Sequence, residues 1–90
     1  MVTLMKCGSK AVTGSASSVD IDFATDTENE STPADFPAGY TVIVCAVPDW
    51  ATSLRISAAP DNSGVSFAFG TAAASTGGIL YWMAMGYKLA

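Results

Sequence analysis

This chain of 90 residues has eight carboxylate side chains, and six of them lie in one stretch. Their oxygens could hold a hard cation, but the spacing lacks the glycine and the closing bidentate glutamate of a dedicated calcium loop. We therefore interpret the stretch as a solvated acidic loop, and no metal or other cofactor is expected. The acids in question are Asp20, Asp22, Asp26, Glu28, Glu30 and Asp35.

The side chains that usually perform catalysis are missing or lack partners. Histidine is absent, so the usual general base near neutral pH is missing. No serine lies in a Gly-x-Ser-x-Gly elbow. Cys7 and Cys45 have neither the spacing nor the neighbours of metal ligands, and no two carboxylates can be assigned the acid and nucleophile roles of a polysaccharide hydrolase. The chain is not expected to be an enzyme.

Two predicted turns contain side chains suited to ligand binding. In the first, Trp50 adjoins Asp49, and a sugar site needs this pairing of an aromatic ring for stacking with a carboxylate that accepts from hydroxyls. Alternatively, Trp50 folds back as a lid over one end of the fold. In the second turn, Asp61 and Asn62 could bind a ligand together with the acidic loop of a neighbouring subunit.

Arg55 lies on the predicted strand between these two turns. Its guanidinium could donate to a ligand, or it could pair across strands with Asp20 or Asp22. The strand, residues 53–58, spans roughly 20 Å at ~3.3 Å per residue, so the two turns lie at opposite ends and cannot form one site within a subunit. We favour the Trp50 turn, since stacking tolerates weak polar recognition and suits a multivalent adhesion module.

The segments that position these residues have the alternating or continuously apolar patterns that predict β-strands. Turn signals separate them at the roughly 8–12 residue spacing of an antiparallel sandwich or barrel, and no helix start is evident. We predict an all-β fold, a six- or seven-stranded antiparallel β-sandwich over residues 19–90, with residues 1–18 as an N-terminal arm or added strand. The expected strands are Val19–Phe23, Tyr40–Val47, Ser53–Ala58, Val65–Phe69 and Ile79–Tyr87. The expected core consists of Val19, Ile21, Phe23, Leu54, Ile56, Val65, Phe67 and Phe69, plus one face of each apolar strand.

The last strand, Ile79–Tyr87, is apolar on both faces and is therefore expected to be central. A chain this small buries only about 60–65% of its unfolded surface, so a partner subunit would stabilise it. Small residues beside Trp82 leave room for another chain, so we predict that the Trp82 face contacts other subunits and that the Met83 face is core. The predicted interface residues are Val42, Val44, Trp82, Ala84 and Gly86.

Charge and hydropathy exclude several partners. The net charge is −4, and the four basic residues do not cluster, so no nucleic acid is expected to bind. The N-terminus has no apolar signal-peptide segment, and the last strand is too short to span a bilayer as a helix, so no membrane insertion is expected. Cys7 and Cys45 are expected to be buried or half-buried thiols rather than a disulfide.

The order and character of these segments resemble the H-type lectin domain, including relatives at the receptor-binding tips of bacteriophage tail fibres. The ending Tyr81-Trp82-Met83-Ala84-Met85-Gly86-Tyr87 is similar to the family's Trp-Ile-Ala-Ile-Gly ending. A loop ending in Phe36-Pro37, a strand containing Arg55-Ile56 and a Gly-x-x-Phe-x-Phe-like strand at Gly64–Phe69 precede it in the expected order.

The resemblance implies a six-stranded sandwich that forms a homotrimer and binds a host cell-surface glycan. Arg55 falls where the family places an arginine for subunit or sugar contact. Ser53 replaces the usual asparagine, and residues 70–74 lack the aromatic and histidine sugar ligands, so sugar specificity does not carry over.

Two functions follow as expectations from the resemblance. The first is a phage or prophage virion protein at a tail-fibre or baseplate tip, in contact with other virion tail proteins, that mediates host attachment. Such a protein is made in the bacterial cytoplasm. The alternative is a purely structural trimeric virion module, a decoration or connector protein with no ligand.

Overall fold

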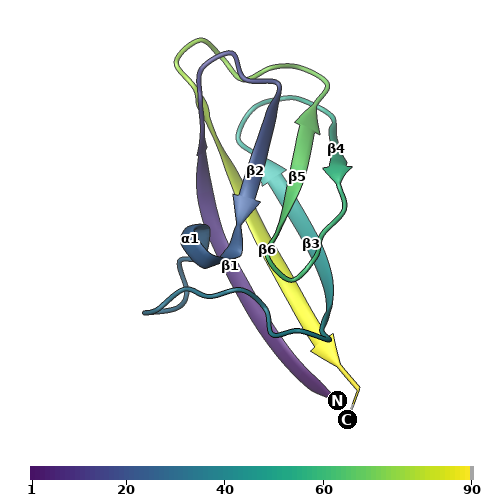
Figure 1. Ribbon diagram of the computed structural model, residues 1–90. Coiled ribbons are helices and arrows are strands. Elements are labelled where there is room, and N and C mark those ends of the chain that lie inside the picture. Colours follow the sequence, from purple (N-terminus) through teal and green to yellow (C-terminus); the bar gives the residue numbers. More distant parts are fainter. Residues whose placement is uncertain (90) are drawn as a thin grey trace.

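The computed structural model describes residues 1–89 as two three-stranded antiparallel sheets packed as a sandwich (Figure 1). The predicted all-β sandwich is therefore confirmed, with six strands. The elements in chain order are β1 (Val2–Val12), β2 (Ser18–Asp22), α1 (Phe23–Asp26), β3 (Thr41–Pro48), β4 (Leu54–Ala58), β5 (Gly64–Phe69) and β6 (Gly78–Lys88).

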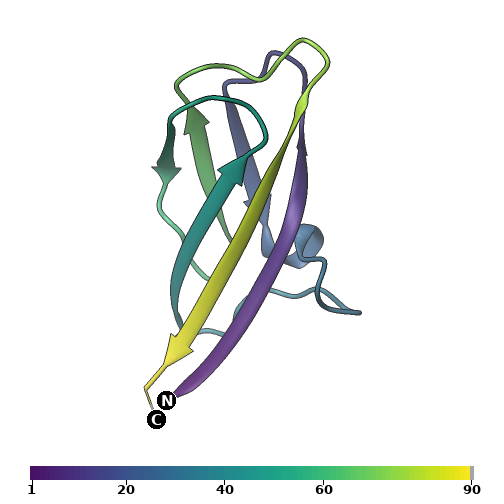
Figure 2. The same ribbon diagram turned by 180° about the vertical axis from the view of Figure 1, so that it is seen from behind.

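The first sheet has the order β1-β6-β3, and the second has the order β2-β5-β4. β6 is therefore a central strand, as its two apolar faces predicted. β1 pairs with β6 along its whole length, from Val2 opposite Lys88 to Val12 opposite Gly78. Figure 2 shows these two long strands side by side, with the first sheet toward the viewer. The N-terminal segment is thus an integral strand of the sheet rather than a separate arm.

The core lies between the sheets, where β6 faces β5. Leu80, Trp82 and Ala84 on β6 are 0%, 3% and 0% exposed, and Phe67 on β5 is 3% exposed. Burial of each large side chain stabilises the fold by about 1.5–3 kcal/mol. Of the predicted core residues, Ile21, Phe23, Val65, Phe67 and Phe69 are buried, while Val19 and Leu54 are partly buried and pack against them.

The prediction that Ile56 belongs to the core is wrong, because its side chain is 47% exposed. The reason lies in its strand. β4 is a short edge strand, and its register with β5 shifts between Ile56 and Ala58. Ile56 is still in register opposite the buried Phe67 and so faces the core side, but at the edge of the sheet, where the pairing ends, its side chain is only partly covered.

The chain leaves β2 through a single helical turn, α1, which the sequence did not predict. Asp22 ends the strand and caps the helix, since its carboxylate accepts a 3.0 Å hydrogen bond from the amide of Ala24. The turn places Phe23, predicted as the last strand residue, fully inside the core. There its ring packs edge-on against Phe36 and tilted against Trp82, with centroids 5.1 and 5.6 Å apart.

The acidic loop after α1 packs along the free edge of β1 and is only partly a solvated loop, contrary to the prediction. Asn29 accepts from the amide of Cys7 and donates to the carbonyl of Met5, both at 3.0 Å. Glu30 pairs at 2.7 Å with Lys6, whose side chain is 3% exposed and lies over the ring of Phe36. Edge strands usually need such cover, and this loop provides it for β1.

Candidate functional site

The face of β6 predicted to contact other subunits is instead the core face of the single chain. Trp82 and Ala84 are buried between the sheets, and Gly86 is buried because the ring of Phe36 packs on its Cα, where a Cβ would overlap the ring. Val42 and Val44 on β3 are half-buried and pack against the same core. The prediction of these five residues as the interface is therefore wrong for this side of the sheet.

The opposite face of the same sheet, which we call the outer face, is the one left open. Met83 was predicted to be core, but it is 44% exposed, and Ile43 and Tyr81 are 52% and 51% exposed. Five side chains from β1, four from β3 and five from β6 point this way, and none is charged. They are Thr3, Met5, Cys7, Ser9, Ala11, Thr41, Ile43, Cys45, Val47, Ile79, Tyr81, Met83, Met85 and Tyr87.

The middle of the outer face is hollowed. Cys7, Cys45, Val47, Tyr81 and Met83 help to line a depression of about 270 Å³ whose walls are almost entirely apolar. Two strands of 11 residues and one of 8, at about 3.3 Å per residue and about 4.8 Å apart, present on the order of 450 Å² in projection, before side-chain relief is added. A contiguous apolar patch of this size on a monomer usually marks an interaction site.

Trp50 occupies the lid position that was the alternative to a sugar-binding role. Its ring packs edge-on against Phe69, with centroids 4.7 Å apart, and its indole N–H donates to the carbonyl of Thr71 at 2.9 Å. Gly78 allows the close approach, since a Cβ there would lie 2.7 Å from the indole ring. The indole is half-buried and fixed, and it closes one end of the sandwich.

Asp49 is engaged in the same structural contact. Its carboxylate accepts from the amide of Ile79 at 2.9 Å, and its own amide donates to the carbonyl of Ile79 at 2.9 Å. These two bonds join the end of β3 to the start of β6. One carboxylate oxygen of Asp49 and the indole N–H of Trp50 are thus engaged in hydrogen bonds within the fold.

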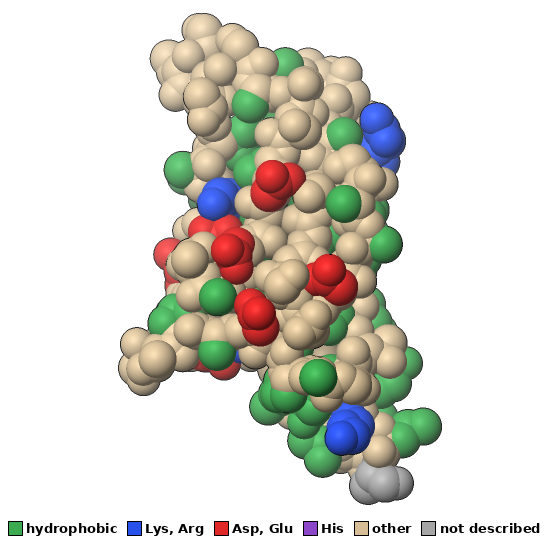
Figure 3. All heavy atoms as spheres, viewed as in Figure 1, with side chains coloured by type: hydrophobic (Ala, Val, Ile, Leu, Met, Phe, Trp, Pro, Cys, Tyr) green, Lys and Arg blue, Asp and Glu red, His purple; other side chains and the backbone are tan. Residues whose placement is uncertain are grey.

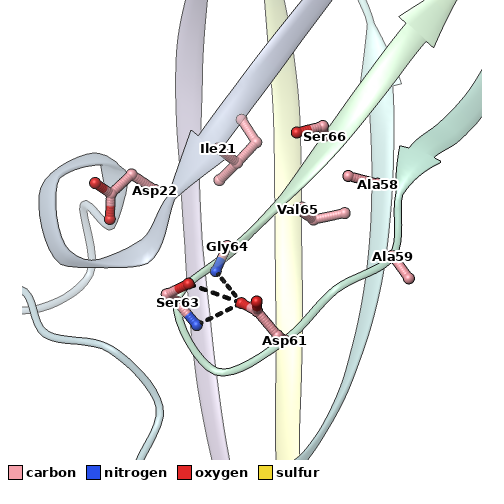
Figure 4. A pocket seen from close by; sticks show the side chains of 9 residues that line it. All are labelled: Ile21, Asp22, Ala58, Ala59, Asp61, Ser63, Gly64, Val65 and Ser66. Atoms are coloured by element: carbon pink, nitrogen blue, oxygen red, sulfur yellow. Dashed lines mark hydrogen bonds between the residues drawn. The ribbon is translucent and has the colours of Figure 1, made fainter.

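Asp61 shapes the turn between β4 and β5. Its carboxylate accepts from the hydroxyl and amide of Ser63, both at 2.8 Å, and from the amide of Gly64 at 3.0 Å (Figure 4). The bonds from Ser63 and then from Gly64 hold the pKa of Asp61 below its ordinary value of 3.8. Asn62 is exposed at the tip, and its backbone carbonyl accepts a hydrogen bond from the backbone amide of Phe36 at 2.8 Å.

A second hollow, of about 290 Å³, opens beside this turn at the bulge of β4 (Figure 4). It is more polar than the first. Asp61, Ser63 and Ser66 line it together with backbone, and Ala58 and Ala59 form an apolar side. The hydroxyl of Ser66 donates to Asp20 at 2.6 Å. Hydroxyl and carboxylate groups around a small apolar patch suit a polyhydroxylated ligand.

Arg55 lies away from both turns and from the acids predicted to pair with it. Arg55 on β4 is paired with Ala68 on β5, and Ala68 is paired in turn with Ser18 on β2. The β2 residue in the same row as Arg55 is therefore a serine and not Asp20 or Asp22. No ion pair of Arg55 exists within residues 1–89. The five predicted ligand residues therefore divide into three places: Asp49 with Trp50, Asp61 with Asn62, and Arg55 alone on the strand between them.

The acidic side chains gather on the side of the molecule that carries β2 and the segment after it (Figure 3). In the described part of the chain, no three acidic or sulfur side chains are grouped so that they could hold a metal ion. Among residues 1–89 no helix is long or apolar enough to cross a membrane. Comparison of the chain with protein-family models, curated proteins and solved structures found no match.

Proposed function

We propose that the chain is a phage or prophage virion protein, a homotrimeric module at a tail-fibre or baseplate tip that attaches to glycans on the host cell. The observation that carries this proposal is the uncharged apolar outer face of the β1-β6-β3 sheet. The resemblance to H-type lectins adds the number of subunits and the glycan as ligand class.

A second copy of the same chain suits the outer face better than a charged partner. With a net charge of −4, two copies repel each other except where they present neutral surface. The lysines on β1, Lys6 and Lys10, point to the other side of the sheet and pair there with Glu30 and Asp26. Stable interfaces bury about 800 Å² per partner, and the outer face would supply the central part of such a contact.

The hollow beside the Asp61 turn is the better candidate for the glycan, because Trp50 is used as a lid. Trimerisation through the outer face leaves this hollow open, since it lies on the other sheet. Three copies per trimer would strengthen weak individual binding through multivalency.

The experiment combines light scattering with a polysaccharide array. Purified protein should scatter as a particle of three 9.2 kDa chains and should bind a subset of bacterial surface polysaccharides. Ala59→Trp fills the hollow without removing a hydrogen bond of the turn, so it should abolish binding while the trimer persists. Asn62→Ala is the matched change at the exposed tip; contrary to the expectation from the sequence, Asn62 does not line the hollow, so this variant should bind nearly as the parent does. A monomer at micromolar concentration would contradict the proposal.

The structural alternative, a trimeric decoration or connector module, is favoured by one observation. Neither turn presents a free tryptophan, since the indole of Trp50 is packed and hydrogen-bonded. A trimer that binds no polysaccharide on the array but co-purifies with virion tail proteins would support this alternative over host attachment.

A further inference from the structure

Among the four edge strands of the two sheets, β3 is the one that nothing in residues 1–89 protects. The loop after α1 covers β1 from Met5 to Ser9. β2 and β4 have five residues each, β2 carries Asp20 and Asp22, and the register of β4 shifts after Ile56. Short length, charge and bulges are the usual protection of an edge. β3 has eight residues, no charge and no register shift.

One hydrogen bond shows which backbone groups of β3 are free. The amide of Asp49, one residue beyond the end of β3, donates to the carbonyl of Ile79 on β6. Because the N–H and C=O groups of successive strand residues point alternately to the two sides, the odd-numbered residues of β3 bond to β6 and the even-numbered ones face outward. The free donors and acceptors are those of Val42, Val44 and Ala46.

The opposite edge of the same sheet follows the same rule. Even-numbered residues of β6 bond to even-numbered residues of β1, so the odd-numbered residues of β1 face outward. These are the residues to which the loop after α1 bonds, namely Met5, Cys7 and Ser9. No such bond reaches residues 41–48 from any described segment other than β6. The free row of β1 is therefore filled, and the free row of β3 is open.

A strand added to β3 would continue both faces of the sheet. Its residues opposite the even-numbered positions would point to the core side, toward the margin where Ile56 on β4 is 47% exposed. β3 and β4 lie on the same side of the sandwich in Figure 1 and in Figure 2. The residues between would join the outer face beside Ile43 and Cys45. The thiols of Cys45 and Cys7 are both free and exposed, which corrects the expectation that they are buried or half-buried.

The two ends of the β3 edge carry opposite charges. Asp49 follows the strand directly. At the other end, the ammonium of Lys88 lies 4.0 Å from where a Cβ on Gly39 would be, and it has no ion pair within residues 1–89. A hollow of about 410 Å³ opens there, lined by Lys88 together with Gly39, Thr41 and Tyr87. An antiparallel guest strand would begin beside Asp49 and end beside Lys88, so a basic residue at its start and an acidic residue at its end would be paired.

We propose that the β3 edge binds an extended segment of a neighbouring protein as a fourth, antiparallel strand of the sheet. The segment has apolar side chains at the three alternate positions opposite Val42, Val44 and Ala46, and uncharged residues between them. Each of these three pairs exchanges both of its N–H···O bonds. A basic residue precedes this run, and an acidic residue follows it.

A second copy of this chain could also pair its β3 with the open edge. That contact is formed around a two-fold axis and closes as a dimer, whereas the proposed function has three copies that meet through the outer face. The choice of a different protein as the guest therefore rests on the proposed trimer. The open edge itself is a property of the single chain.

The probe is a fluorescently labelled nine-residue peptide with lysine first, glutamate last and valine alternating with threonine between them. A matched peptide carries N-methyl groups on the three valines, so it keeps the side chains but cannot donate to β3. Fluorescence anisotropy should show saturable binding of the first peptide to the full chain and at least about tenfold weaker binding of the second. Hydrogen exchange should show that the first peptide protects the amide of Val44.

Two protein variants test the same contact from the other side. Val44→Pro removes the central free N–H without breaking a bond to β6, since proline is tolerated where the N–H of an edge strand faces solvent. It should bind the peptide at least about tenfold more weakly and still melt cooperatively. Thr3→Pro is the matched change at an outward position of β1 and should bind as the parent does. Lys88→Glu should weaken binding of the peptide and improve binding of one with its terminal charges exchanged.

The outcomes separate this inference from the proposed function. Equal binding of the methylated and unmethylated peptides, a folded Val44→Pro variant that binds normally, or no binding at millimolar concentration overturns the added strand. If light scattering still finds three chains, the proposed trimer stands. Two chains per particle with the Val44 amide protected in the protein alone would show that a second copy occupies the edge, and both proposals fail. A monomer that binds the peptide overturns the trimer and supports the open edge.

Discussion

At the scale of single residues, Trp50 shows how one side chain can close an end of the sandwich. Trp50→Ala should lower the free energy of unfolding by about 2–4 kcal/mol, since it removes packing on Phe69 and the bond to Thr71. Trp50→Phe keeps most of the packing and should lose only about 1–2 kcal/mol. Urea denaturation measures both. If Trp50→Ala leaves the stability unchanged, Trp50 does not act as a lid, and the ligand-binding role predicted from the sequence would be favoured again.

Asp61 gives the fold a pH-dependent component. Its pKa is lowered in the folded state by bonds from Ser63 and Gly64, so it stabilises the fold above pH 3.8 and this contribution is lost as the pH falls through the lowered pKa. Asp61→Asn removes the contribution. The parent should therefore be more stable than this variant at pH 7, and the difference should shrink below pH 3.8.

The comparison is made by denaturant titration at pH 7 and at pH 3. Asp35→Asn is the matched control, since Asp35 is exposed and makes no hydrogen bond within residues 1–89. It should leave the stability nearly unchanged at pH 7. A difference between the parent and Asp61→Asn that stays constant with pH would show that the turn does not depend on the charge of Asp61.

Residue types alone could not decide which face of β6 is core. Both faces are apolar, and small residues at 84 and 86 fit a close subunit contact as well as a close intrachain one. The intrachain contact comes from Phe36, 50 residues away in the sequence, whose ring fills the space above Gly86. Alternation did place Ile21, Phe67 and Phe69 correctly, because the other face of each strand carries only small or polar residues.

At the scale of elements, the sequence did not predict that the loop after α1 packs along the free edge of β1. The single turn of α1 is too short for a helical periodicity, and Gly8 within β1 reads as the end of a strand. The structure needs this glycine because α1 ends against it, and a Cβ would lie 3.1 Å from the indole nitrogen of Trp82. Contacts between distant segments therefore set the length of β1.

The cover of β1 by Asn29 leads to a prediction about local opening. Asn29→Ala removes the bonds to Cys7 and Met5, each worth about 1 kcal/mol. The amide of Cys7 should then exchange with solvent at least about tenfold faster, while amides of β6 keep their protection. Hydrogen exchange by mass spectrometry measures this. Asn62→Ala, at an exposed tip, is the control; equal exchange in both variants would show that the loop does not protect the edge.

At the scale of the whole molecule, the sequence predicted the sandwich but not the order of strands in its sheets. That order decides which apolar surface is left open. β6 lies between β1 and β3, and both neighbours contribute further uncharged side chains, so the outer face is three strands wide. The pattern of apolar residues within one strand cannot show which other strands lie beside it and widen the apolar face.

The outer face should tolerate a charge in the monomer but not in the assembly. Met83→Glu places a carboxylate on the central strand, where the monomer leaves it in water and a trimer would bury three of them near one axis. Burial of an unpaired charge costs about 3–5 kcal/mol, so the concentration for half-assembly should rise at least about 100-fold. Light scattering should then find a monomer that still melts cooperatively.

Two matched changes separate assembly from folding. Ser18→Glu puts the same charge on the outward side of the second sheet and should leave the proposed trimer intact. Ala84→Glu puts it on the core face of β6, where Ala84 is fully buried, and should prevent folding rather than yield a folded monomer. If Met83→Glu stays trimeric, the outer face is not the contact between subunits. If Ala84→Glu gives a folded monomer, the two faces of β6 have been assigned the wrong way round.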